Sequence, residues 1–287
     1  MGRFPNVAAP RDVNEKMLWR KVFDRNPNFV QFSDKLRAKQ YVQRQAPGIA
    51  QCPVLWNGTD LDDLPEHLSD QPCLLKANHS SGMNIVLDGG PVDRRGLKKS
   101  TRNWLAHRHD RVHGEWAYRD VVPELFLEAD ISSGQRADLV DLIVYVFSNT
   151  VALIVATIGE KTDHERVALF DAKGERLYAV PVSYRSGWRA AALPDDFRLP
   201  LDAAVLVRHA LAIANGTDHL RVDFMWNGEQ LYFCEITVYP GGGYRAYSDP
   251  GIVELMTRSW NIADSWFLRT PQTGWRRHYA AWLKTQQ

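Results

Sequence analysis

The chain has 287 residues, of which 45% are hydrophobic and 24% charged, an ordinary composition for a globular protein of one large domain or two lobes. Its 35 basic and 34 acidic residues leave a net charge of +1, which argues against a dedicated nucleic-acid binder because such proteins usually carry a basic excess. The apolar runs are too short to span a bilayer, and the N-terminus lacks the apolar core of a signal peptide. We therefore expect a cytoplasmic protein without a membrane span.

Three cysteines, Cys52, Cys73 and Cys234, lie far apart and form no Cys-x-x-Cys pair. This spacing predicts buried free thiols in a reducing compartment rather than zinc ligands or disulfides. The ten tryptophans are many for this length. They are compatible with a sugar site, but large aromatic residues more often fill a core or a partner surface.

Hydrophobic periodicity and turn signals predict strand pairs that alternate with helices, and therefore an α+β protein with at least one mostly antiparallel sheet. The first expected helix ends before Asn26, and Ser33 is expected to cap the second. A turn is expected at Asn57-Gly58, and a hairpin around Ser148-Asn149. The expected helices cover residues 13–24, 34–44, 97–109, 201–215, 252–266 and 278–284, and the expected strands cover 53–56, 73–77, 83–87, 124–128, 141–147 and 151–158.

Another hairpin is predicted after residue 220, where Asn227-Gly228 separates two strand-like segments and is a strong hairpin signal. A two-residue turn would pair Asp223 with Tyr232 and place Glu235 on the opposite face. A three-residue loop or a bulge would pair Asp223 with Phe233 and bring Asp223, Glu235 and Thr237 to one face.

Acidic side chains on one half-buried face repel each other unless a cation lies between them, and Mg²⁺ accepts carboxylate oxygens. The alternative is a solvated surface hairpin whose acids pair with Arg221 or water. The large apolar neighbours Phe224, Trp226 and Phe233 favour a partly dry site.

A second centre is predicted at Lys76, which lies in an apolar strand just before the loop Asn-His-Ser-Ser-Gly at residues 78–82. A buried ammonium needs a counter-charge, and small residues in such a loop let backbone N–H groups approach phosphate oxygens. The sequence is not a Walker A motif, because the lysine precedes the loop. The alternative is an edge-strand lysine that extends to water.

Two further patterns are weaker. His107, His109 and His113 have a spacing that suggests metal binding, but positions i and i+2 do not share a helix face. The basic residues around them are most simply a solvated surface. Asp218-His219 is accompanied by no nucleophile motif.

Several segments taken together resemble the TupA-like ATP-grasp family. They are FSDKLRAKQYV (32–42), LLKANHSSGMN (74–84), GEWAYRDVVPELFLEADI (114–131), DLIVYVF (141–147), HERVALFD (164–171) and RVDFMWNGEQLYFCEITVYPGGG (221–243). The resemblance implies an ATP-grasp fold, with two α+β lobes and ATP in the cleft between them. We then expect an N-terminal helical segment over residues 1–50, a smaller lobe over 51–130 and a larger lobe over 131–287.

The resemblance also implies site residues. Those expected to bind the nucleotide are Lys35, Lys76, the loop residues Asn78, His79, Ser80, Ser81 and Gly82, and the hinge residues Leu127, Glu128 and Ala129. Those expected to bind Mg²⁺ are Asp223, Glu235 and Thr237, with Arg221 beside them, while His164 and Arg166 are expected at the γ-phosphate or the acceptor. One departure is Ile143, where the family pattern has lysine; Arg136 or Arg166 are candidates to replace its charge.

The resemblance implies an ATP- and Mg²⁺-dependent ligase that joins a small-molecule carboxylate to an amine through an acyl phosphate. A role in polysaccharide or peptide-type biosynthesis follows from the family, with a polysaccharide precursor as one candidate partner. The alternatives are a nucleotide-binding protein that has lost catalysis and a sugar-transfer protein of polysaccharide biosynthesis.

Overall fold

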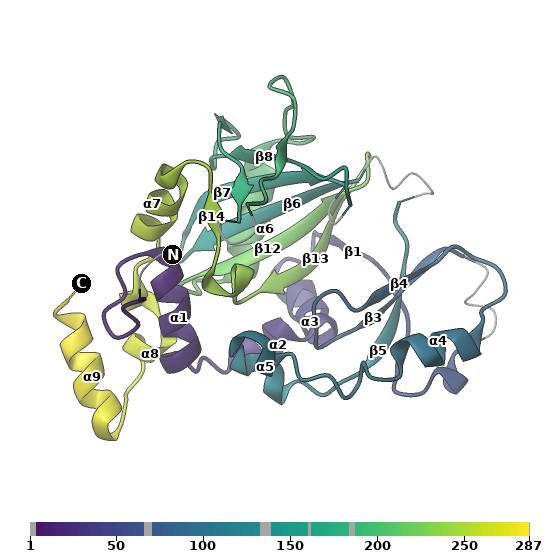
Figure 1. Ribbon diagram of the computed structural model, residues 1–287, viewed down its shortest axis with the longest axis horizontal. Coiled ribbons are helices and arrows are strands. Elements are labelled where there is room, and N and C mark those ends of the chain that lie inside the picture. Colours follow the sequence, from purple (N-terminus) through teal and green to yellow (C-terminus); the bar gives the residue numbers. More distant parts are fainter. Residues whose placement is uncertain (1–3, 66–70, 133–138, 160–161, 184–186, 287) are drawn as a thin grey trace.

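The computed structural model describes residues 4–65, 71–132, 139–159, 162–183 and 187–286 of the chain. The strands in these ranges form an eight-stranded sheet with the order β1-β13-β12-β6-β7-β8-β11, in which β9 pairs with β8. They also form a four-stranded sheet with the order β2-β5-β3-β4 and a separate pair, β10 and β14. Figure 1 shows the four-stranded sheet to one side of the large sheet, with the C-terminal helices at the opposite end of the molecule.

The strands of the large sheet are β1 (Ala50–Gln51), β6 (Val140–Phe147), β7 (Thr150–Ile158), β8 (Arg166–Phe170), β9 (Arg176–Leu177), β11 (Ala191–Ala192), β12 (Leu220–Trp226) and β13 (Leu231–Thr237). Those of the small sheet are β2 (Val54–Gly58), β3 (Cys73–Ala77), β4 (Asn84–Leu87) and β5 (Leu125–Ala129), and the separate pair is β10 (Pro181–Val182) with β14 (Ala246–Tyr247). The α-helices are α1 (Val13–Phe23), α2 (Asn28–Ser33), α3 (Lys35–Gln45), α4 (Arg94–Thr101), α5 (Asp110–His113), α6 (Ala203–Ala214), α7 (Pro250–Ser259), α8 (Trp266–Arg269) and α9 (Gly274–Lys284).

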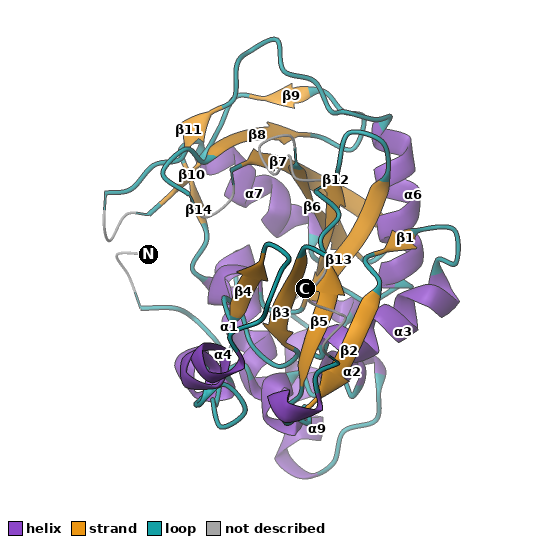
Figure 2. Cartoon of the chain, turned by 90° about the vertical axis from the view of Figure 1, so that its right-hand side faces the viewer, coloured by secondary structure: helices purple, strands orange, loops and turns teal. Residues whose placement is uncertain are grey.

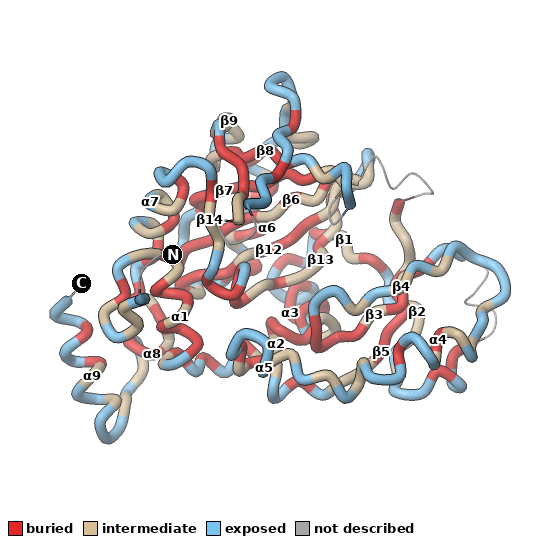
Figure 3. The backbone as a smooth tube through the Cα atoms, in the orientation of Figure 1, coloured by how far each residue is buried: buried red, intermediate tan, exposed pale blue. Residues whose placement is uncertain are grey.

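Two hydrophobic cores support the two sheets. The larger core combines the large sheet with buried residues of the N-terminal helices, including Trp19, Phe29 and Val42. The smaller core lies under the small sheet and includes Leu75, Leu97 and Leu127. Helix α6 packs along one face of the large sheet (Figure 2). Figure 3 shows burial concentrated along the central strands, whereas most of α9 is exposed.

The α+β class and the hairpin of β6 and β7 are confirmed. Ser148, in the turn, has a φ of 50°, a conformation that a short turn requires. The residues expected as an N-terminal helical segment pack into the core of the large sheet. The division into three parts remains a prediction, because separate cores do not by themselves fix domain boundaries.

Some local predictions are wrong. Ser33 does not cap α3; it ends α2, and the Asp34 carboxylate accepts from the backbone N–H groups of Leu36 and Arg37. Asn57-Gly58 is not a turn, because both residues pair with β5 as part of β2. The Asn57 amide also donates to Glu124 Oε2 at 2.7 Å, and this contact supports the extended conformation.

Helix limits also differ from the prediction. The helix expected over 97–109 is α4, which begins at Arg94 after the Asp93 cap and ends at Thr101, and α5 follows separately. The helix expected over 252–266 ends at Ser259, and Ser265 caps the next one. At the second break the backbone of Trp260 is extended, and the side chains of Trp260 and Ile262 are both buried in the large core.

Candidate active site

The hairpin of β12 and β13 brings its acids to one face, as the bulged alternative predicted, but with a different pairing. Asp223 lies opposite Glu235 and Arg221 opposite Thr237. The loop between the strands spans residues 227–230, and a register shift leaves Cys234 as the extra residue of a β-bulge. The bulge is necessary, because without it Asp223 would face Cys234 and Glu235 would point to the other side.

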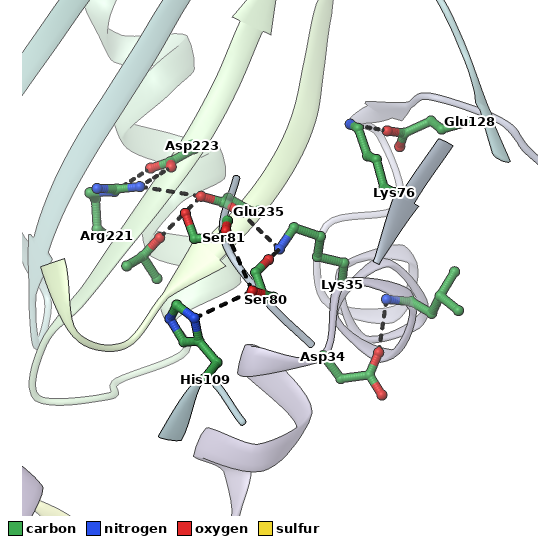
Figure 4. A network of polar contacts seen from close by, with 12 residues as sticks. Asp34, Lys35, Lys76, Ser80, Ser81, His109, Glu128, Arg221, Asp223 and Glu235 are labelled. Atoms are coloured by element: carbon green, nitrogen blue, oxygen red, sulfur yellow. Dashed lines mark hydrogen bonds and ion pairs between the residues drawn. The ribbon is translucent and has the colours of Figure 1, made fainter. Parts of the chain in front are cut away.

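Arg221 holds the two carboxylates together (Figure 4). Its Nε and Nη2 donate to the two oxygens of Asp223 at 2.8 and 2.5 Å, and Nη2 also donates to Glu235 Oε1 at 3.3 Å. Lys35 Nζ lies 3.7 Å from Glu235 Oε2, and Thr237 Oγ1 lies 3.5 Å from Glu235 Oε1. Burial raises the pKa of Asp223 to about 7, with the charge of Arg221 opposing the shift and that of Glu235 adding to it. The acids therefore stand beside two fixed cations.

Lys76 points away from the core of the small sheet and forms an ion pair with Glu128, a neighbour on β5. Lys39 of α3 binds the other oxygen of Glu128 at 2.5 Å. Burial alone would raise the pKa of Glu128, but the charges of Lys76 and Lys39 hold it below its usual value. The side chain of Lys76 remains 26% exposed. The protein thus supplies a counter-charge of its own and leaves one side of Lys76 open to an anion.

The loop after β3 is anchored at its beginning. Asn78, His79 and Ser80 are buried; the Asn78 side chain accepts from the backbone of Glu124 at 2.8 Å, and the His79 ring lies 3.0 Å from the Trp104 carbonyl. Lys35 Nζ donates to the Ser80 carbonyl at 2.5 Å. Only Ser81 and Gly82 are exposed, so the part of this loop able to cover a ligand is confined to its tip.

Direct contacts bring together Lys35, Ser80, Arg221, Asp223, Glu235 and Thr237. Asn78 joins this group, because its carbonyl accepts from Lys35 N at 3.1 Å. Four other expected residues lie elsewhere. Leu127 points into the small core, and Ala129 N donates to the Pro53 carbonyl. His164 precedes β8, Arg166 begins it, and both are exposed. Arg136 lies outside the described residues.

Three functional candidates near these acids were not predicted as such. Tyr118 lies within electrostatic reach of Glu235, and burial together with the charges of Glu235 and Glu115 raises the pKa of its hydroxyl. His109 contacts Ser80, although its sequence spacing suggested only a poor metal site. Glu115 was not predicted, because no motif in the sequence marks it. Its contact with His109 forms only in the folded structure.

The donor set fits Mg²⁺ bound together with a nucleotide. No group of three or more His, Cys, Asp or Glu residues suited to a metal occurs within the ranges that the structure describes. Asp223 and Glu235 supply two carboxylates, and Mg²⁺ is usually bound by one or two carboxylates plus substrate phosphates and water. The site therefore suits a metal that arrives with phosphate oxygens better than a metal held by the protein alone.

Two sheets, each with its own core, and a strand-borne acid pair beside Arg221 and Lys35 fit a protein of the ATP-grasp class. A family model described as TupA-like ATPgrasp matches residues 15–256. The chain therefore belongs to this family and has the ATP-grasp fold, as the resemblance indicated. No curated protein matches it. Every helix within the described ranges is too short or too polar to cross a bilayer.

Solved ATP-grasp structures are distantly similar. D-alanine–D-alanine ligase from Bacillus anthracis is 16% identical with a TM-score of 0.41, over 74% of this chain and 57% of that one. The ATP-grasp ligase PsnB, complexed with a minimal precursor, is 14% identical with a TM-score of 0.38, over 95% and 67%. N5-carboxyaminoimidazole synthase from Aspergillus clavatus is 13% identical with a TM-score of 0.40, over 75% and 46%. The chain thus spans little more than half of the first ligase.

Proposed function

We propose that this protein is an ATP- and Mg²⁺-dependent ligase that joins a carboxylate to an amine through an acyl phosphate. The observation that carries the proposal is the pairing of Asp223 with Glu235 across the bulged hairpin, bracketed by Arg221 and Lys35. Phosphoryl transfer depends on positioning and on neutralising charge. A pair of acids for the metal and two cations for phosphate oxygens meet both needs.

Each residue then has a distinct task. Asp223 and Glu235 hold Mg²⁺, which when bound neutralises charge on the phosphates, and Thr237 keeps Glu235 oriented. Arg221 fixes the two acids, while Lys35 and Lys76 attract phosphate oxygens from opposite lobes. Backbone N–H groups at Ser81 and Gly82 approach the phosphates. Glu128, with Leu127 and Ala129 on the same strand, is proposed at the adenine and ribose end, and His164 and Arg166 are proposed at the γ-phosphate or the acceptor.

The reaction has two steps. The substrate carboxylate attacks the γ-phosphorus of ATP, and ADP leaves with the bonding electrons. The amine then attacks the carbonyl carbon of the acyl phosphate, and phosphate leaves. The name of the family supports substrates from polysaccharide or peptide-type biosynthesis, and small-molecule acids and amines are the expected partners.

A second candidate is a protein that binds nucleotide without turning it over. Ile143 of β6 pairs directly with Asp223, at the position where the family pattern has lysine, so one cation is missing beside the acid pair. ATP binding without ADP release would favour this candidate. In that case Ile143→Lys would be expected to restore turnover.

A screen for ADP release tests the proposal. Purified protein with Mg-ATP is offered pools of uronic acids and N-acetylated amino acids as acids, with amino acid amides as amines, so that no compound supplies both groups. The ligase predicts ADP release that requires both an acid and an amine. Release of ADP independent of both, or binding of a nucleotide-sugar with indifference to ATP, would contradict the proposal.

A further inference from the structure

A histidine outside the expected site faces the loop that follows β3. His109 Nδ1 lies 3.4 Å from Ser80 Oγ, and His109 Nε2 lies 3.6 Å from Glu115 Oε2. If the ring proton is on Nε2, that edge of the imidazole faces the carboxylate of Glu115, and Nδ1 is left as the acceptor. A hydroxyl, an imidazole and a carboxylate therefore stand in line (Figure 4 shows the first two).

Glu115 is buried in a well-anchored part of the structure. The Glu115 side chain is 8% exposed, and its carboxylate lies next to Gly242, where a Cβ would come within 3.5 Å of Oε1. The buried Lys21 donates to the carbonyls of His113 and Gly242 at 2.8 and 2.6 Å, which fastens this segment to the loop after β13. A buried carboxylate fixed beside an imidazole helps to orient the ring.

The Ser80 end is loosely held. Ser80 Oγ lies 3.4 Å from both His109 Nδ1 and the Ser81 carbonyl, whereas a well-made hydroxyl hydrogen bond is about 2.7–2.8 Å long. The hydroxyl can therefore turn to Ser81 and release Nδ1 to another donor. The side chain of His109 is 14% exposed, and catalytic contacts are often long before the substrate binds.

The position of His109 suggests which donor replaces the hydroxyl. Ser80 connects His109 to Lys35, and Lys35 in turn contacts Glu235. In Figure 4, His109 and the Lys76–Glu128 pair lie on opposite sides of Lys35. If the nucleotide base lies toward Glu128 and its phosphates toward Glu235, His109 lies on the phosphate side of the site, on the side of Lys35 away from the base.

We propose that His109 is the catalytic base that takes a proton from the ammonium group of the second substrate, with Glu115 as its positioning residue. This inference rests on the proposed ligase function. The ammonium gives one proton to Nδ1, and its nitrogen lone pair is freed to attack the acyl carbon. The bond from that carbon to the phosphate oxygen breaks, and phosphate leaves with the electron pair and takes up the second proton of the new amide nitrogen. The imidazolium returns its proton to solvent. The substrate class assigned to this end of the site is a primary amine that is charged near neutral pH.

Other groups also face this imidazole. The ring of Tyr118 packs edge-on at 4.5 Å between centroids, and the ring of His107 lies at 6.0 Å. His79 lies within electrostatic reach, and the remaining neighbours are Ser80, Glu115 and, beyond Ser80, Lys35. Of these, only Glu115 is an acid at ion-pair distance from His109.

Hydroxylamine separates the proposed role from a structural one, because it is largely uncharged near neutral pH and needs no base to attack an acyl phosphate. The assay compares the wild type and His109→Gln with Mg-ATP, the pools of acids, and either hydroxylamine or amino acids as nucleophile. We expect His109→Gln to keep hydroxamate formation within about threefold, while amide formation falls about 100-fold, the contribution typical of a general base. The amide rate of the variant should rise more steeply with pH than that of the wild type, because free amine increases with pH.

Two variants complete the experiment. Glu115→Gln should lower amide formation about tenfold and leave hydroxamate formation unchanged. This variant tests the role of the His109–Glu115 pair even if His109→Gln is unstable. His107→Gln removes a neighbouring imidazole without removing the Ser80 contact, and should leave both rates unchanged. Equal amide rates in the wild type, His109→Gln and Glu115→Gln would overturn the proposal that His109 is the catalytic base. A wild type that forms neither hydroxamate nor amide would overturn the ligase function itself, and this inference with it.

Discussion

Asp223 and Glu235 face each other directly across β12 and β13, and they do so because Cys234 is an extra residue in β13. Two carboxylates at such a cross-strand position repel each other. Arg221 and Lys35 offset that repulsion in the metal-free protein. The arrangement therefore places two carboxylates at the point where a metal bound to ATP would need them.

Glu235→Gln should abolish most ATP turnover while the fold survives. The amide keeps the shape of the side chain but removes one metal-binding charge, and loss of one such electrostatic contact typically costs about 10²–10³-fold in kcat. Glu235 is one-third exposed, so little stability should be lost. ADP release gives the rate, and circular dichroism with a thermal melt checks the fold. Wild-type turnover in this variant would show that Glu235 has no role in metal binding.

Lys76→Met should abolish ATP turnover more completely than Lys39→Met. Both substitutions remove one partner of the buried Glu128 and leave the other, so their losses of stability should be similar, at about 1–3 kcal/mol. Only Lys76 combines this contact with a substantially exposed side chain, which is 26% accessible against 9% for Lys39. Thermal melts measure the stability, and nucleotide titration measures the affinity. Equal losses of ATP affinity would mean that Lys76 acts only through Glu128.

Mg-ATP should raise the melting temperature. A ligand present at 100 times its Kd stabilises the native state by about 2.7 kcal/mol, which corresponds to roughly 5 °C for a protein of this size. ATP with EDTA should give a smaller shift, because Asp223 and Glu235 then repel the phosphates. The measurement is a thermal-shift titration with ATP, ADP and Mg²⁺, and a flat response to all of them would count against nucleotide binding.

Asp24→Asn should stabilise the protein more at pH 8 than at pH 5. Asp24 is fully buried, Oδ1 accepts from the backbone N–H of Phe267, and Oδ2 has no partner among the described residues. Burial and the charge of Asp218 raise the pKa of Asp24 to about 7. Because the folded-state pKa lies above the unfolded one, ionisation destabilises the fold increasingly from about pH 4 to pH 7.

The asparagine removes that cost and still accepts the Phe267 hydrogen bond. The expected gain at pH 8 exceeds that at pH 5 by about 2 kcal/mol, or roughly 5 °C in melting temperature. Asp196→Asn, at an exposed position, is the control and should show no such difference. A gain independent of pH would indicate that the pKa of Asp24 is not raised by folding, so that its carboxylate is already ionised in the folded protein at pH 5.

The sequence by itself determined the α+β class, the β6–β7 hairpin, the strand that carries Lys76 and the identity of the acid pair. These features depend on local alternation, on turn residues and on motifs within one segment. The family resemblance supplied the rest of the expected site. Hydrophobic periodicity predicted a helix that continues past Trp260, but the structure ends the helix before this residue. The predicted cap at Ser33 is wrong because the neighbouring Asp34 is the better-placed acceptor.

Only the tertiary structure decided the register and the partners. A bulge at Cys234 moves every following side chain of β13 to the other face of the sheet. Cysteine is not a residue type that predicts a bulge. The pairing of Lys76 with Glu128 and Lys39, of Lys35 with Glu235, and of His109 with Ser80 and Glu115 joins residues from different elements. Which charged groups pair depends on their burial and on the distances between them, and both are set only when the chain has folded.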